Sequence, residues 1–222
     1  MSGRARLAVL ISGRGRNLQA MIDAVGAGHI DADWAVVISN RAEAQGLQRA
    51  KAAGIPTVVL AHGDYPDRDA FDQALGDALE AHRPDIIVMA GFMRILGADF
   101  VRRFAGRMIN IHPSLLPKYR GLNTHQRALD AGDAEHGASV HFVTEELDGG
   151  PVAVQGRFSV RPEDDASTLA DRVMHEVELK IYPQAVAWLA RGELCWHADG
   201  LRFRGAPLAA PLGLADLDPA FA

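Results

Sequence analysis

The chain has 222 residues, 48% of them hydrophobic and 23% charged, which is typical of a soluble globular protein and argues against extensive disorder. Its 28 acidic residues outnumber its 23 lysine and arginine residues, giving a net charge of −5, so nucleic acid is not an expected partner. The apolar runs are too short to cross a membrane, and the single cysteine, Cys195, excludes an intrachain disulfide and suits a reducing, cytoplasmic compartment.

Short apolar runs alternate with helical patterns in the first part of the chain. The apolar runs lie at residues 7–11, 34–38, 57–60 and 86–90. Between them, apolar residues recur at helical spacing over 17–25, 45–53 and 67–82. Continuous apolar runs are typical of parallel strands buried on both faces. The alternation therefore predicts an α/β fold with a doubly wound, mostly parallel sheet.

The rest of the chain is less regular. Further strands are predicted at 108–111, 138–143 and 151–160. The second of these alternates in hydropathy, so we expect it to be half exposed. Residues 165–191 predict a long helix kinked at Pro183, and residues 193–203 predict a closing hairpin.

The last residues, 205–222, are rich in Ala, Pro and Gly and are expected to form a loose tail. No linker divides the preceding residues. We therefore expect a single domain over residues 1–204.

A glycine-containing loop joins the first predicted strand to the first predicted helix. Gly13 and Gly15 let amide N–H groups approach a bound group, and the helix N-terminus adds partial positive charge, so this loop predicts an anion site. A dinucleotide-binding loop would have a third glycine where Leu18 stands, and a P-loop would have Gly-Lys-Ser/Thr. A single phosphate, as on a phosphoribosyl compound, fits better. The alternative is a tight turn with Asn17 as the helix cap.

Asn110 and His112 stand two residues apart at the end of the strand predicted at 108–111. Residues two apart in a strand project to the same side, and the carboxyl edge of an open α/β sheet is where ligands bind. An amide beside an imidazole can hold a carbonyl oxygen and stabilise it as it becomes negative. The alternative role is a hydrogen-bonded loop anchor.

Asp148, in an Asp-Gly-Gly-Pro turn, is a carboxylate that can raise the pKa of His112 or accept a proton through water if the two lie close. A Ser114–His112–Asp148 hydrolase triad is disfavoured because the chain has no Gly-x-Ser-x-Gly elbow. A metal site is not expected either, because no pair of histidines has a recognised ligand spacing.

Four segments carry a family resemblance: residues 10–18 (Leu-Ile-Ser-Gly-x-Gly-x-Asn-Leu), 90–96 (Ala-Gly-Phe-Met-Arg-Ile-Leu), 109–119 (Ile-Asn-Ile-His-Pro-Ser-Leu-Leu-Pro-Lys-Tyr) and 136–151. Together they closely resemble the phosphoribosylglycinamide formyltransferases, the folate-dependent enzymes of purine biosynthesis. The resemblance extends from about residue 6 to about residue 188. It implies a Rossmann-like fold whose N-terminal half binds the phosphate and nucleotide and whose C-terminal half, with the long helix, binds the folate.

The resemblance also implies a reaction without a metal, in which the substrate amine attacks the formyl carbon of 10-formyltetrahydrofolate. Asn110 would hold the formyl oxygen, and protonated His112 would stabilise the oxyanion and act as general acid. Asp148 would keep His112 charged and help move the proton of the amine. The implied substrate-binding residues are Gly15, Arg16, Asn17, His175 and Glu178. The implied folate-binding residues are Arg68, Met93, Arg94, Ile95, Leu96, Asn110, Thr144, Glu145, Glu146, Leu147 and Asp148.

The chain departs from the family pattern at three places. Arg16 stands where the phosphate loop usually has serine, and Asn123 stands where histidine is frequent. The long helix holds one extra residue before Ile181, so the ribose-binding glutamate is Glu178 or Glu176. Alignment from the Ile181 side favours Glu178.

The expected product is formylglycinamide ribonucleotide, formed together with tetrahydrofolate, by an enzyme that is a monomer or homodimer and binds only small molecules. The alternatives are another folate-dependent formyltransferase, a 10-formyltetrahydrofolate hydrolase, or a non-catalytic nucleotide- or folate-binding module. The methionyl-tRNA enzyme and the hydrolase carry additional domains that we do not expect here. A binding module would not need Asn110, His112 and Asp148 together.

Overall fold

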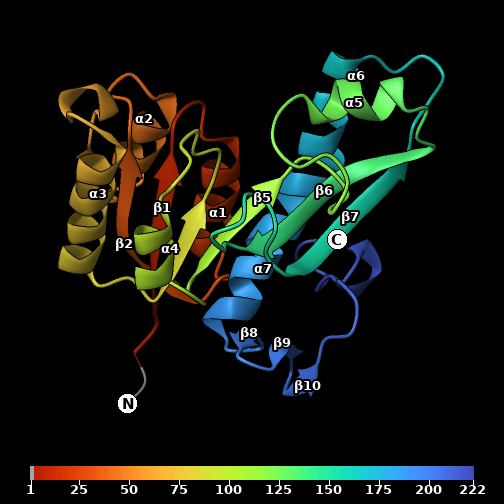
Figure 1. The fold of residues 1–222 in the computed structure, drawn as a ribbon. Coiled ribbons are helices and arrows are strands. Elements are labelled where there is room, and N and C mark those ends of the chain that lie inside the picture. The colour runs from red at the N-terminus through yellow and green to blue at the C-terminus, as the bar shows by residue number, and fades with distance from the viewer. Residues whose placement is uncertain (1–2) are drawn as a thin grey trace.

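The main sheet of the molecule has seven strands in the order β3-β2-β1-β4-β5-β6-β7. The computed structural model describes residues 3–222, and Figure 1 shows this sheet running through the middle of the molecule. The first five strands in this order are mutually parallel: β3 (Thr57–Val59), β2 (Ala32–Ser39), β1 (Ala5–Ile11), β4 (Ile86–Met89) and β5 (Met108–His112). The last two, β6 (Glu135–Phe142) and β7 (Val152–Ser159), are antiparallel. The predicted α/β, mostly parallel sheet is confirmed.

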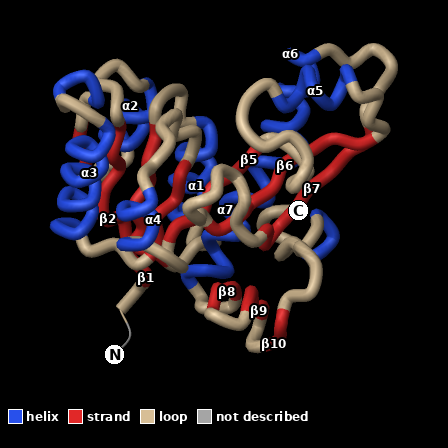
Figure 2. Tube along the Cα trace, viewed as in Figure 1, coloured by secondary structure: helices blue, strands red, loops and turns tan. Residues whose placement is uncertain are grey.

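Helices cover both faces of the parallel strands because β1 is apolar on both sides. Leu7, Val9 and Ile11 pack into one core, while Ala8 and Leu10 pack into a second core on the other face. Residues from α1 (Arg16–Gly26), α2 (Gln45–Ala52) and α7 (Leu179–Ala190) complete the first core, and residues from α3 (Arg68–His82) and α4 (Ala98–Arg103) complete the second. Figure 2 shows the helices on either side of the strands. A further short helix, α5 (Thr124–Asp130), precedes β6.

Strand β6 is buried along almost its whole length, so the expectation of a half-exposed strand is wrong. Only Glu135 at its start is exposed. Residues of α7 pack on one face, and the loop after β5 covers the other. In that loop Leu116 donates its N–H to Ser139 Oγ (3.1 Å), and Ser139 Oγ donates to the carbonyl of Ser114 (2.7 Å). The polar residues of the alternating pattern therefore form hydrogen bonds within the protein rather than with water.

The long helix predicted at 165–191 is three consecutive pieces. These are α6 (Ala166–Arg172), a π-helical segment (Val173–Glu178) and α7. Pro183 lies inside α7, so the change of helical geometry occurs upstream of the proline that was expected to cause it.

The segment 205–222 packs on the molecule, so the expectation of a loose tail is wrong. Leu212 donates its N–H to the carbonyl of Ala153 (2.9 Å) and accepts from the N–H of Gln155 (2.8 Å), which extends the sheet beyond β7. Leu217 and Phe221 are buried in the first core. Figure 2 shows the C-terminus beside β7. A few apolar side chains among the Ala, Pro and Gly residues are enough to anchor the segment.

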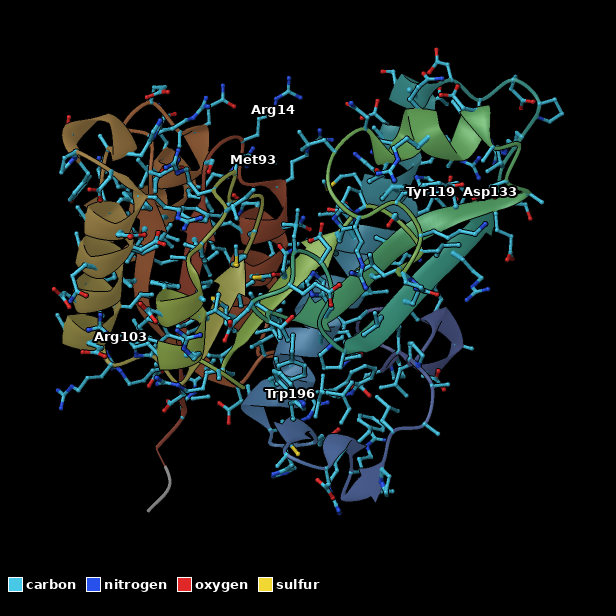
Figure 3. The ribbon with its side chains drawn as sticks, viewed as in Figure 1. Arg14, Met93, Arg103, Tyr119, Asp133 and Trp196 are labelled. Carbon is cyan, nitrogen blue, oxygen red and sulfur yellow. The ribbon has the colours of Figure 1, made fainter. Side chains whose placement is uncertain are left out.

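The hairpin predicted at 193–203 is confirmed, with β8 (Leu194–His197) antiparallel to β9 (Gly200–Phe203) and a short β10 (Ala206–Pro207) beside them. Trp196 of β8, labelled in Figure 3, packs against the ring of Phe142 at 5.6 Å between centroids. Within residues 3–222 there is no helix long and apolar enough to span a bilayer. The same residues contain no cluster of three or more His, Cys, Asp or Glu suited to a metal ion.

Candidate active site

Asn110 and His112 project from the carboxyl end of β5, as their spacing predicts. Across the antiparallel ladder Asn110 faces His141 of β6, and its Nδ2 lies 3.1 Å from His141 Nε2. Because His141 Nδ1 lies 3.0 Å from the Phe142 carbonyl, this nitrogen carries the hydrogen, and Nε2 accepts from Asn110. This contact uses one of the two amide hydrogens of Asn110, and the other can serve a ligand.

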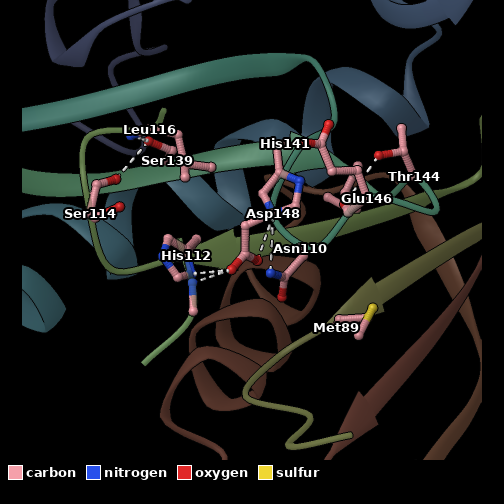
Figure 4. Close-up of polar contacts among 12 residues, drawn as sticks. Met89, Asn110, His112, Ser114, Leu116, Ser139, His141, Thr144, Glu146 and Asp148 are labelled. Atoms are coloured by element: carbon pink, nitrogen blue, oxygen red, sulfur yellow. Dashed lines mark hydrogen bonds and ion pairs between the residues drawn. The ribbon is translucent and has the colours of Figure 1, made fainter. Parts of the chain in front are cut away.

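Asp148 lies beside both histidines, as Figure 4 shows. Its Oδ2 is 3.3 Å from His112 Nδ1 and accepts the N–H of Gly121 at 2.9 Å. Its Oδ1 is 3.6 Å from His141 Nε2. The backbone of Asp148 has φ 47°, a left-handed conformation that aspartate tolerates better than most residues. The turn formed by the Asp-Gly-Gly segment thus places the Asp148 carboxylate at the end of β5.

Both ring nitrogens of His112 face oxygen acceptors. Nε2 lies 2.8 Å from the Tyr119 carbonyl, and Nδ1 faces Asp148. This arrangement suits an imidazolium, yet the ring is only 6% exposed, and burial lowers the pKa of His112 below its usual value despite the Tyr119 carbonyl and the Asp148 carboxylate. In the free protein desolvation is thus the larger effect on the pKa of His112, while the Asp148 carboxylate acts in the expected direction, toward the charged form.

The pKa of Asp148 is lowered. Burial opposes this shift, but the hydrogen bond from the N–H of Gly121 and the proximity of His141 and His112 outweigh it. At neutral pH Asp148 is therefore ionised and can accept a proton. A protonated His112 gives up its proton readily, because its pKa is lowered. Such a pair can exchange a proton with a bound reactant at neutral pH.

A small pocket of about 130 Å³ opens on the Asn110 side of β5. Its apolar wall comes from Met89, Phe92, Leu96, Val101 and Val143. Its polar wall is the loop 144–148, together with Asn110, His141 and Arg94. An apolar slot with polar groups along one edge suits a flat heteroaromatic ring.

A second pocket opens on the other side of β5, where Ile111 and Pro113 line it together with the glycine loop. Gly15 has φ 70°, and a Cβ there would lie 2.7 Å from the Cα of Gly46, so this tight approach requires glycine. Figure 3 shows Arg14 and Met93 at the same edge of the sheet. Arg14, Arg16 and Arg41 all line the pocket, which gives it positive charge in addition to the N-terminus of α1.

Asn17 makes a side-chain contact and does not cap the helix, so the alternative given for this residue is not what the structure shows. The cap position of α1 is Gly15, without a side-chain hydrogen bond. The Asn17 side chain donates from Nδ2 to Oε2 of Glu178 at 2.7 Å, and both residues are 6% exposed. Burial raises the pKa of Glu178, although the hydrogen bond from Asn17 and the charge of Arg16 oppose the shift. Glu178 is thus fixed at the rim of the glycine-loop pocket.

A family model described as formyl transferase matches residues 5–186 of the chain. The chain belongs to the formyl transferase family. It is 50% identical to the phosphoribosylglycinamide formyltransferase of Haemophilus influenzae over 85% of this chain and 89% of that protein. It is 48% identical to the Escherichia coli protein of the same name over 94% of this chain and 98% of the other. The Coxiella burnetii phosphoribosylglycinamide formyltransferase structure superposes with a TM-score of 0.89 at 49% identity, covering 95% of this chain and 99% of that one.

Most of the residues expected to form the sites of this formyl transferase lie in the two pockets. The first pocket holds Asn110, Asp148 and the folate candidates Arg94, Ile95, Leu96, Thr144, Glu145, Glu146 and Leu147. The second holds the substrate candidates Gly15, Arg16, Asn17 and Glu178. His112 lies between them at the strand end, beneath the Tyr119 carbonyl.

Three candidates lie elsewhere. Met93 lines the glycine-loop pocket and not the apolar one. Arg68 lies in a neighbouring groove with Asp72 and Gly97. His175 is exposed on the π segment, and Met174 lines the glycine-loop pocket instead. His175 was chosen because it lies one α-helical turn before Glu178. In the π segment the spacing differs, and Met174 faces the pocket in its place.

The sequence patterns missed His141, which holds Asn110 and approaches Asp148. The available indication was its place in the strand predicted at 138–143, but neither the partner of that strand nor the pairing register can be obtained from a single sequence. The second glutamate candidate, Glu176, pairs with Arg172 at 2.8 Å on the outer surface. The geometry therefore favours Glu178 for the pocket.

Proposed function

We propose that the chain transfers the formyl group of 10-formyltetrahydrofolate to the amine of 5′-phosphoribosylglycinamide, giving formylglycinamide ribonucleotide and tetrahydrofolate. One observation carries the proposal. The end of β5 separates an apolar pocket edged with polar groups from a positively charged glycine-loop pocket, with Asn110, His112 and Asp148 at the junction. Two substrates bound in these pockets meet beside groups that can stabilise an oxyanion.

The glycine-loop pocket supports binding of the ribonucleotide. A phosphate can accept from amide N–H groups of residues 15–17 at the start of α1, where the helix dipole is favourable. Glu178 then lies where a sugar hydroxyl can donate to it. The side chain of Arg16 is 34% exposed and lies 3.6 Å from Asp171, so it supplies charge at the rim of the pocket.

The apolar pocket supports binding of the folate. The pterin ring can fill the slot next to Phe92 and Leu96, with its polar edge against the loop 144–148. The formyl group then points toward Asn110. Glu145 and Glu146 of this loop are held by Arg102 and Arg120, which brace it from outside.

The chemistry follows from the three junction residues. The amine nitrogen forms a bond to the formyl carbon, and the remaining amide hydrogen of Asn110 and the protonated His112 stabilise the resulting oxyanion. The bond from the carbon to N10 of the folate then breaks, and His112 supplies the proton that this nitrogen takes up. Asp148 accepts the proton lost by the amine, directly or through water.

This sequence of steps requires one His112 nitrogen to leave its present partner. The Tyr119 carbonyl is the easier partner to give up, because it belongs to a loop and binds as a neutral acceptor, whereas Asp148 is charged. Tyr119 is itself held by a hydrogen bond from its hydroxyl to Asp133 (2.8 Å), and Figure 3 shows the two side chains together. Substrate binding must therefore displace the Tyr119 backbone while His112 keeps its contact with Asp148.

The test is a formyl-transfer assay with the ribonucleotide and 10-formyltetrahydrofolate, following the release of tetrahydrofolate. Release that requires the ribonucleotide supports the proposal. Release without it indicates the hydrolase reaction instead. No release from folded protein would overturn the proposal and leave another acceptor amine or a binding function.

A further inference from the structure

The π segment between α6 and α7 absorbs one residue without disturbing the helix that follows. In a continuous α-helix, an additional residue rotates everything after it by about 100°. A π turn bonds residue i to residue i+5 and takes up the residue locally. The register of α7 is fixed independently, because the buried Tyr182 hydroxyl donates to the carbonyls of Met89 (3.0 Å) and Ile109 (3.2 Å). The extra residue therefore has to be accommodated before Leu179.

Glu178 is the last residue of the π segment, so the π-helical geometry determines where its side chain points. It points inward to Asn17, at 2.7 Å. Glu176, two residues earlier, points outward to Arg172. Asn17 Oδ1 is buried without a hydrogen-bond partner among the described residues, so this corner of the glycine-loop pocket holds a polar atom that a bound ligand can satisfy.

The π segment needs room against the sheet, and Gly156 of β7 supplies it. A Cβ on Gly156 would lie 2.5 Å from Cγ1 of Val177, and 3.2 and 3.3 Å from side-chain atoms of Leu214 and Ile181. The backbone of Gly156 is not in the left-handed region, so it is the missing side chain that matters here. Val177 is fully buried and directly precedes Glu178.

We propose that Gly156 is a positioning residue for the ribonucleotide site. Its bare backbone lets Val177 approach β7, which sets the π turn and aims Glu178 at Asn17 and the glycine loop. A side chain at residue 156 pushes Val177 away from the sheet and moves Glu178 with it. The inference rests on the proposed function, because it assigns to Gly156 the affinity for one of the two proposed substrates.

The test is Gly156→Ala, assayed for both substrates after transfer to the ribonucleotide has been shown for the unsubstituted protein. We expect KM for phosphoribosylglycinamide to rise about tenfold, while KM for 10-formyltetrahydrofolate and kcat stay within about twofold. Gly26→Ala is the matched control, because a Cβ there has nothing within 4 Å and its φ is ordinary. It leaves both KM values unchanged.

A second substitution separates positioning from general damage to the packing. The double variant Gly156→Ala/Val177→Ala removes the Val177 methyl groups that the added Cβ would strike. It returns KM for the ribonucleotide to within about threefold of the unsubstituted value. If Gly156→Ala alone does not fold, Val177→Ala alone tests the same contact and raises only this KM, about threefold.

The inference is overturned if Gly156→Ala keeps the original KM, if both KM values rise together, or if the double variant shows no rescue. It is also overturned if Gly156→Ala does not fold and Val177→Ala leaves KM for the ribonucleotide unchanged. Failure of the proposed function gives a different result, since the unsubstituted protein then releases no tetrahydrofolate with the ribonucleotide.

Discussion

Replacing Asp148 with asparagine removes the charge that faces His112 while keeping the shape of the side chain. In the structure His112 Nε2 donates to the Tyr119 carbonyl, so the neutral ring presents a lone pair at Nδ1. The asparagine oxygen can take the Oδ2 position and still accept the N–H of Gly121, and its amide group then faces His141 Nε2. The Asp148→Asn protein is therefore expected to fold normally but to hold His112 in its neutral form.

The separation of the two groups sets the magnitude. At 3.3 Å and an effective dielectric constant of about 20, the attraction between imidazolium and carboxylate is about 5 kcal/mol. Each 1.36 kcal/mol of lost transition-state stabilisation costs about tenfold in rate. The asparagine recovers part of the interaction through its dipole, so we expect kcat to fall by between about 10²- and 10³-fold. KM for either substrate should change little, because both bind mainly through other groups.

The assay is the kcat–pH profile of the purified protein, with Asp130→Asn on the surface of α5 as a matched control. Since protonated His112 is required and the substitution lowers its pKa further, the alkaline limb of the profile must move to lower pH. A kcat within threefold of the original, or an alkaline limb at the original pH, would refute the role given to Asp148.

Three further predictions concern the ribonucleotide site and acid stability. Arg16→Ser is expected to raise KM for the ribonucleotide about threefold without changing kcat, because the side chain lies at an exposed rim. Glu178→Gln is expected to raise the same KM about tenfold and Glu176→Gln to leave it unchanged, both measured in the transfer assay. Burial lowers the pKa of His136 from 6.5 to about 4, so the unfolded chain binds the extra proton between these values. This group alone should lower the free energy of unfolding, measured with urea, by roughly 3 kcal/mol as pH drops from about 6.5 to about 4, and His136→Gln should remove that part of the pH dependence.

The parallel half of the fold could be predicted because each of its elements is defined by a local pattern. Continuous apolar runs such as residues 7–11 indicate strands covered on both faces, and the structure buries both faces of β1. Asn110 and His112 could be placed together for the same reason, since two-residue spacing in a strand is local geometry. The glycine loop could be recognised because a turn of that shape requires Gly15.

Features that depend on long-range packing could not be predicted. Strand β6 has an alternating pattern typical of a half-exposed strand, but a loop 25 residues away in sequence covers its polar face through Ser114 and Ser139. The tail has a loose composition but is anchored by Leu217 and Phe221. The lowered pKa of His112 depends on how deeply the ring is buried, which the residue types around it do not reveal.

The change from parallel to antiparallel strands at β5 is what assembles the site. Because β6 returns in the opposite direction, its last residues lie beside the start of β5, with His141 opposite Asn110. The loop 143–150 therefore begins next to β5 and can turn back across it, which brings Asp148 to His112. A parallel β6 would pair with β5 in another register and leave Asn110 without His141. From the sequence, Asp148 could be placed next to His112 only by the family resemblance. In the structure, the antiparallel direction of β6 is what brings the two residues together.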